Sequence, residues 1–225
     1  MIPLFAVAQP AWLNEVSSAI ETRHHFYPTK WVCTGDTMRV DTTEQNGIIV
    51  LLDGYWITCQ EISNDIWQWY VLQLHEKAPE PLKPATSRTA AQIEELCRQL
   101  NLSTHGTWRL PTLKEWFFAY HGGLFSEGYR FAGSNRQEWV AWCKKNSGGK
   151  LHDATQLIAN ELGLYDMSGN AAEMVTEGDS IVFVGGSCLD DMEAPSPTPP
   201  PEVCGFRLAM PQPLWFDKEG QRIYR

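Results

Sequence analysis

The stretch that decides the fold is Gly163-Leu-Tyr-Asp-Met-Ser-Gly-Asn-Ala-Ala-Glu173, which combines two carboxylates with glycines and small residues. Asp166 and Glu173 supply the carboxylates, and Gly169 with the turn after it leaves main-chain carbonyl groups free to point inward. A calcium ion takes six to eight oxygen ligands of these two kinds and tolerates irregular loops. The spacing of an EF-hand is absent, and an Asx turn at Asp166 with a solvated or capping Glu173 explains the same residues. The residues alone favour this second interpretation, and both stay open.

The composition is that of a globular protein. The chain has 225 residues, of which 43% are hydrophobic and 20% are charged. Its formal net charge is −9 and no run of Lys or Arg is longer than a pair such as Lys144-Lys145, so we expect no binding to nucleic acid or anionic lipid. No apolar stretch approaches the roughly 20 residues that span a bilayer, so we expect no transmembrane segment.

The first residues allow two interpretations of the protein's location. Residues 1–8 resemble the end of a signal peptide, because Ala6 and Ala8 have the spacing of a cleavage site. A basic region is absent and the apolar run is short, so a plain N-terminal strand or arm is the alternative. We expect a secreted or periplasmic protein, with a cytoplasmic one as the alternative.

Local patterns predict one domain of short elements and long loops. We expect an arm over residues 1–46 with a short helix at Ala11–Thr22, a domain over 47–210 and a tail over 211–225. Apolar runs predict three strands, at Gly47–Leu52, Ser180–Val184 and Gly205–Ala209. Apolar residues at helical spacing predict two helices, one from Ser63 or Asn64 to about Lys77 and one over Ala90–Leu100.

A third helix carries the clearest start and stop signals. Thr112 with Glu115 three residues later is a capping box, and Gly122-Gly123 provides the left-handed turn that ends a helix. Residues 125–170 then show little periodicity and many Gly, Asn, Ser and Asp residues. A loop of that length in a compact domain is usually functional or organised by a metal.

Five motifs in a fixed order resemble one family, the formylglycine-generating enzymes or sulfatase-modifying factors. The motifs include Glu61-Ile-Ser-Asn64, Arg109-Leu-Pro-Thr112 with Glu115-Trp116, Asn160 through Asn170, Gly185-Gly-Ser187 and Gly205-Phe-Arg207. The resemblance runs from roughly residue 47 to residue 210. It implies an α+β fold of the C-type-lectin-like kind, rich in loops and with little regular secondary structure.

The resemblance also implies a calcium site and so reverses the preference stated above. By position, Asp166 and Glu173 correspond to side-chain ligands, and Gly169 and Ala171 to carbonyl ligands. Asn146, in the motif Asn146-Ser-Gly-Gly149, is a candidate for a second calcium site. We therefore expect Ca²⁺ as the bound metal.

The chemistry of the family's enzymes does not carry over to this chain. Those enzymes oxidise a substrate cysteine with a copper-bound pair of thiolates, three and eight residues after the serine of the Gly-Gly-Ser motif. After Ser187 these positions hold Asp190 and Pro195, and proline offers no ligand. Cys188 lies one residue after the serine, and a lone thiolate facing hard carboxylates is a poor copper(I) site. We therefore expect no copper.

Two functions remain open on the sequence. One is a non-catalytic binding or structural module, stiffened by calcium, whose loops recognise a protein or a glycan. The other is an oxidoreductase of the family with altered thiol or metal chemistry at Cys188. If the chain is exported, we expect a disulfide between Cys188 and Cys204, which would end the enzyme interpretation. Arg109 and Arg207 are predicted to be structural arginines, each paired with a carboxylate.

Overall fold

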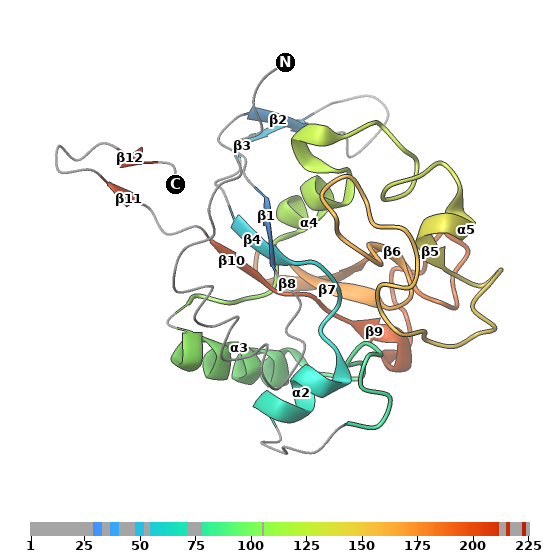
Figure 1. Ribbon diagram of the computed structural model, residues 1–225, viewed down its shortest axis with the longest axis horizontal. Coiled ribbons are helices and arrows are strands. Elements are labelled where there is room, and N and C mark those ends of the chain that lie inside the picture. Colours follow the sequence, from blue (N-terminus) through green and yellow to red (C-terminus); the bar gives the residue numbers. More distant parts are fainter. Residues whose placement is uncertain are drawn as a thin grey trace.

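The structure is a computed structural model, and it describes residues 29–32, 37–40, 48–51, 55–71, 78–104, 106–211, 215–216 and 222–223. Figure 1 shows short strands in the middle of the molecule, with helices α2 and α3 on one side and α4 on the other. The predicted helix at Ala11–Thr22 and the predicted signal-peptide remnant lie outside these ranges. No helix in the described ranges is long and apolar enough to cross a membrane.

Two small sheets form the centre of the fold. In the first, β4 (Tyr55–Thr58) lies between β1 (Thr29–Val32) and β10 (Ala209–Pro211), and both pairings are antiparallel. In the second, β7 (Ala172–Glu177) pairs antiparallel with β8 (Ser180–Val184) and parallel with β9 (Cys204–Gly205). Strand β1 falls in the predicted arm over residues 1–46, yet it pairs with β4 along its whole length.

The other strands form two-stranded pairs. They are β2 (Thr37–Val40) with β3 (Ile48–Leu51), β5 (Ala141–Trp142) with β6 (Ser168–Gly169), and β11 (Trp215–Phe216) with β12 (Arg222–Ile223). The β5–β6 pair is parallel and joins two parts of the long loop region, whose remaining helix is the single turn α5 (Gln137–Val140). Two 3-10 turns, η1 (Gly123–Phe125) and η2 (Pro201–Val203), complete the described elements. Loop-rich α+β architecture is confirmed.

The hydrophobic core has two parts, one on each face of β4. Successive side chains of a strand point to opposite faces. Trp56 accordingly packs with α2 (Asn64–Tyr70) and α3 (Ala90–Thr104). Tyr55 and Ile57 pack on the other face with α4 (Leu113–Tyr120).

The helix starts agree with the predicted caps. The Ser63 side chain accepts a bond from the Ile66 amide at the start of α2, and the capping box of Thr112 and Glu115 is complete. Gly122 and Gly123 follow α4 with φ of 81° and 58°. The helix predicted to run to about Lys77 has residues 72–77 outside the described ranges, and α3 continues four residues past its predicted end.

The predicted strand at Gly205–Ala209 is wrong in its middle. Strand β9 ends at Gly205 and β10 begins at Ala209. The carbonyl group of Leu208 instead accepts a bond from the amide of Thr58, the last residue of β4, and that of Phe206 accepts one from Ile62, in the irregular segment after β4. This crossing from one sheet to the other turns the Arg207 side chain into the interior between them.

Candidate functional site

The stretch Gly163–Glu173 forms a tight turn in which no other residue fits at Gly169. Asp166, Gly169 and Asn170 have φ of 54°, 75° and 58°, in the left-handed region. A Cβ atom on Gly169 would lie 2.3 Å from the Trp142 carbonyl oxygen, because β6 runs against β5 at this point. The Asn170 amide donates to the same carbonyl at 2.7 Å. The turn is therefore fixed by close backbone contact across the β5–β6 pair.

A buried ion pair lies behind this turn. The Arg207 guanidinium donates through Nε and Nη2 to the two carboxylate oxygens of Glu173, at 2.7 and 2.6 Å. Neither side chain is more than 1% exposed. Arg207 also donates to the carbonyl oxygens of Thr58 and Tyr165, and the Trp116 indole N–H donates to Glu173 at 2.6 Å. The predicted structural role of Arg207 is confirmed.

A second carboxylate, Glu61, joins this pair from the end of β4. Its two oxygens accept bonds from the Ala171 amide and the Asn170 side chain, both at 2.9 Å. Burial raises the pKa of Glu61 well above its usual value, and the charges of Asp166 and Glu173 raise it further. Glu61 belongs to the motif Glu61-Ile-Ser-Asn64, which did not indicate a role at this site.

Asp166 is the third carboxylate, and one of its oxygens has no partner. Its Oδ2 accepts a bond from the Thr155 amide at 2.8 Å. Its Oδ1 is buried and makes no hydrogen bond. Burial raises the pKa of Asp166 to about 6, although the Thr155 bond and the charge of Arg207 lower it. A buried oxygen without a partner calls for a proton, a water molecule or a cation.

The predicted calcium ligands fit a calcium ion only in part. Three carboxyl groups and one guanidinium meet here, so the cluster has a net charge of −2 when all four groups are ionised. The free Oδ1 of Asp166 fits a divalent cation, and so does the charge of the cluster where Glu61 is ionised in spite of its raised pKa. Glu173 does not fit, because Arg207 and Trp116 already bind both of its oxygens. Within the described ranges, no group of three or more His, Cys, Asp or Glu residues is arranged to hold a metal.

The two predicted carbonyl ligands lie in the same turn. The Gly169 amide donates to the Gly185 carbonyl at 2.9 Å, and the Ala171 amide donates to Glu61. A ligand role for their own carbonyl oxygens stays a prediction. Asn146, the candidate for a second site, uses its side-chain amide within its own loop. It accepts from the Cys143 amide and donates to the Ala141 carbonyl.

The loop after Ser187 is organised by Asp190, at the first of the two thiol positions. Asp190 Oδ2 accepts bonds from the Ser187 amide and hydroxyl at 2.8 and 2.6 Å, and Oδ1 accepts from the Ser196 amide at 3.1 Å. Pro195, at the second thiol position, packs against Gly186, where an added Cβ would lie 3.0 Å from the proline ring. Asp190 and Pro195 therefore both stabilise the conformation of the loop.

The disulfide that we expect of an exported chain is not formed in the structure, where Cys188 and Cys204 are both free. Cys188 is completely buried, and burial raises the pKa of its thiol to about 11. The Cys204 thiol donates to the carbonyl groups of Pro199 and Pro200, and burial raises its pKa to about 11 as well. At neutral pH such thiols hold their protons and are poor nucleophiles.

Arg109 forms the second predicted arginine pair, at the start of α4. Its guanidinium donates to both oxygens of Glu115, at 2.8 and 2.7 Å, and its side chain is 39% exposed. The predicted pairing is confirmed. It holds the capping carboxylate of Glu115 in place and lies apart from the buried cluster.

The comparisons with known proteins identify the family. The model of the sulfatase-modifying factor enzyme 1-like domain matches residues 30–210, most of the chain. The chain therefore belongs to this family of formylglycine-generating-enzyme-like domains. One curated relative, the chaperone protein LppX of Paenibacillus barcinonensis, is 38% identical over 90 residues. That match covers 32% of this chain and 32% of the relative, so it spans about a third of the relative's length.

Solved structures share the fold at low identity. Treponema denticola variable protein 1 aligns with a TM-score of 0.68 at 20% identity, over 82% of this chain and 95% of that one. CarF aligns with a TM-score of 0.65 at 20% identity, over 83% and 98% of the two chains. PvdO from Pseudomonas aeruginosa has a TM-score of 0.61 at 16% identity, over 82% and 92%. At these identities the likeness shows the fold alone.

Proposed function

We propose that this chain is a non-catalytic module that binds another protein. The observation that carries the proposal is the bonding of Asp190. The family resemblance places a copper-binding thiolate at this position. In this chain a carboxylate stands there, and its oxygens accept hydrogen bonds from the Ser187 amide and hydroxyl and from the Ser196 amide of the same loop. Cys188, the nearest thiol in sequence, is buried and protonated at neutral pH. These features favour a role in which the fold presents its loops to another protein.

The binding surface is inferred from exposed apolar side chains. Within the described part of the chain, seven large apolar residues are exposed; three of them lie in the long loop region and a fourth directly precedes it. We call these four the loop surface: Leu124, Phe125, Trp139 and Ile158, which are 47–64% exposed. Exposed apolar side chains that form one patch mark interaction sites, and we take these four as one patch.

One backbone hydrogen bond and one bond from a backbone amide to a side chain join segments that carry these residues. The Ile158 amide donates to the Trp139 carbonyl at 3.0 Å, and the Glu127 amide donates to the Glu161 carboxylate at 3.0 Å. Arg136 lies 4.7 Å above the Trp139 ring and adds a cation beside it. Large aromatic and arginine side chains of this kind supply much of the binding energy in protein interfaces.

The curated relative supports a protein partner over a glycan. It is named a chaperone, and a chaperone acts on other proteins. An apolar surface with Phe, Leu and Ile suits the apolar segments of a polypeptide, whose burial gives about 25 cal/mol per Å².

An aggregation assay tests the proposal. The protein should reduce light scattering from heat-denatured citrate synthase, and the variant Phe125→Ser/Trp139→Ser should lose this effect. Leu189→Ser is the matched control, because Leu189 is 41% exposed and lies outside the loop surface. Equal suppression by all three proteins, or none by the unmodified one, would contradict a role for the loop surface. Formylglycine appearing in a sulfatase-type cysteine peptide incubated with copper(I) would contradict the non-catalytic part.

We also propose that calcium stabilises the domain through Asp166. The support is the buried, unpartnered Oδ1 and the charge deficit of the cluster. A bound calcium ion would supply the missing positive charge there. A ligand that binds only the folded state raises stability by RT ln(1 + [L]/Kd). Melting temperatures in calcium should therefore exceed those in chelator, and Asp166→Asn should remove the difference. Identical melting curves for the unmodified protein would refute the site.

A further inference from the structure

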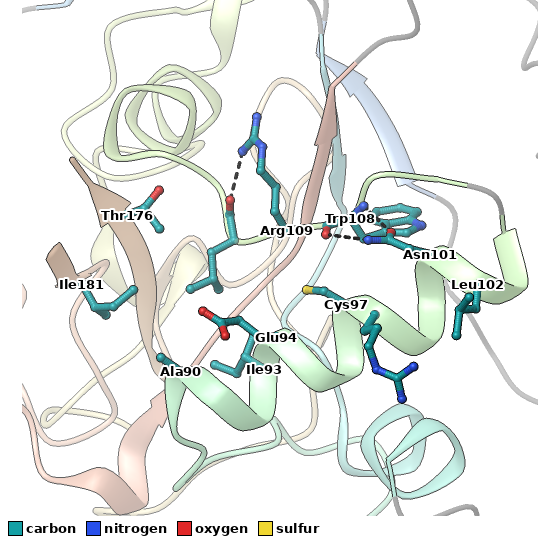
Figure 2. A pocket seen from close by; sticks show the side chains of 12 residues that line it. Ala90, Ile93, Glu94, Cys97, Asn101, Leu102, Trp108, Arg109, Thr176 and Ile181 are labelled. Carbon is teal, nitrogen blue, oxygen red and sulfur yellow. Dashed lines mark hydrogen bonds between the residues drawn. The ribbon is translucent and has the colours of Figure 1, made fainter. Parts of the chain in front are cut away.

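A concave site lies outside the buried cluster and the loop surface. It is a cavity of about 510 Å³ between α3, the segment Trp108–Leu110 and the β7–β8 hairpin. Figure 2 shows the side chains of α3 on one side of this space, and Thr176 and Ile181 on the other. Cavities of about 300–1,000 Å³ are typical of small-molecule sites.

The floor of the cavity is the surface of the hydrophobic core. Ile93 and Cys97 of α3 and Trp108 and Leu110 of the adjoining segment line it, and each is at most 9% exposed. The helix presents this face because residues 93, 97 and 101 follow one another at helical spacing. Asn101 holds the wall together, since its side chain binds the amide and carbonyl of Trp108.

Exposed apolar side chains lie at the rim of the same cavity. Leu102 is 63% exposed and Ile181 is 37% exposed, and both line the cavity. Among the described residues, they account for two of the three large exposed apolar side chains outside the loop surface. An apolar ligand would bury these side chains together with the floor.

The charge in the cavity comes from Glu94. In the described part of the chain, its carboxylate has no hydrogen bond or ion pair, and Figure 2 shows it on the cavity side of α3. The two cations of the lining are already paired. Arg98 donates to both oxygens of Glu95, at 2.8 and 2.7 Å. The Arg109 guanidinium points away from α3 in Figure 2 and binds Glu115.

We propose that this cavity binds a small amphipathic amine, with an apolar chain or ring on the core floor and a protonated amino group beside Glu94. Burial of the apolar part supplies the affinity, at about 0.8 kcal/mol for each buried CH₂ group. The single uncompensated carboxylate selects a cation over an anion or a neutral group. The site is independent of the proposed protein-binding function, because the cavity and the loop surface share no residue.

Three eight-carbon ligands test both parts of the proposal by isothermal titration calorimetry at neutral pH. Octylamine should bind about two- to five-fold more tightly than octanol, the gain expected of an exposed charge pair, and octanoate should bind most weakly. Glu94→Gln should bring the three affinities together. Glu138→Gln, the same change at an exposed position on α5, should leave the order intact. Ala90→Phe should weaken all three ligands by filling the cavity.

Three results would overturn the proposal. The first is octanoate binding as tightly as octylamine, which would mean that Arg98 or Arg109 sets the charge preference. The second is an advantage of octylamine that survives in Glu94→Gln. The third is no binding of any of the three ligands at millimolar concentration. The variant Phe125→Ser/Trp139→Ser should bind the three ligands as the unmodified protein does, whether or not it still suppresses aggregation. The two proposals can therefore fail separately.

Discussion

Replacing Glu173 by glutamine tests the most deeply buried charge pair of the described fold. The substitution keeps the size and shape of the side chain and removes its charge. It leaves the Arg207 guanidinium buried, with neutral acceptors only: the carbonyl groups of Thr58 and Tyr165 and the one amide oxygen that the glutamine retains. Breaking a buried pair on one side typically costs about 3–5 kcal/mol, because a buried charge is left uncompensated. Glu61 and Asp166 still lie near Arg207, so we expect a loss near the lower end of this range.

The expected loss is large enough for a simple thermal assay. In a chain of 225 residues, a change of 3–5 kcal/mol lowers the melting temperature by about 6–20 °C. Glu95→Gln is the control, since its pair with Arg98 is on the surface and should leave the melting temperature unchanged. The double variant Glu173→Gln/Arg207→Met should lose about 0.5–3 kcal/mol less than the two single variants added together. A melting temperature for Glu173→Gln equal to that of the control would refute the reasoning.

Three further predictions concern the turn, a helix cap and a thiol. Gly169→Ala should lower the free energy of unfolding, measured by denaturant titration, by at least the roughly 1–3 kcal/mol of left-handed strain, because its Cβ would also meet the Trp142 carbonyl at 2.3 Å. An unchanged denaturant midpoint would contradict the close approach. Thr112→Ala should cost about 0.5–2 kcal/mol in the same assay, since it removes the capping bond to the Glu115 amide, and a cost near zero would count against the box. Cys188 should resist alkylation in the folded protein and react after unfolding, which mass spectrometry of the labelled peptide would show. Labelling of folded protein would return this cysteine to consideration as a nucleophile.

The local elements were predictable because their signals are local. The capping box at Thr112 and the cap at Ser63 each depend on residues within one helical turn, so the sequence shows both partners side by side. Strand β8 was predicted with the bounds that the structure has. The family motifs supplied the fold class, which periodicity alone could not do for a chain with so much irregular backbone.

The middle of the predicted strand at Gly205–Ala209 failed for a non-local reason. The apolar residues there alternate as they do in a strand. Their hydrogen bonds go to residues 58–62, more than 140 positions earlier in the sequence. Nothing in the local pattern shows that this partner segment is irregular or that the stretch passes from one sheet to another.

Only some residues of the site could be predicted from the sequence, and the partner of Arg207 could not. The sequence shows Asp166 and Glu173 as carboxylates in one stretch, and the family resemblance implies that both bind calcium. The structure adds Arg207 from 34 positions later and Glu61 from more than 100 positions earlier. Glu61 lies in the mixed polar and apolar stretch after β4, and its place in the motif Glu61-Ile-Ser-Asn64 is the signal that could have identified it. Once an arginine has taken both oxygens of Glu173, Asp166 is the residue on which the calcium proposal depends.

Asp190 shows how the loop after Ser187 is held without the thiol that the family resemblance implies at this position. A loop that loses two metal-binding thiols also loses the cross-link that a metal provides, and its backbone then needs other partners. Asp190 supplies them, because one carboxylate accepts three bonds and closes the backbone between residues 187 and 196. Pro195 fixes its own φ and packs on Gly186, so less chain entropy is lost when the loop orders. Asp190 and Pro195, at the two positions that the resemblance assigns to copper-binding thiols, thus determine the conformation of the loop. Asp190→Cys would remove the hydrogen bonds that hold the loop in place.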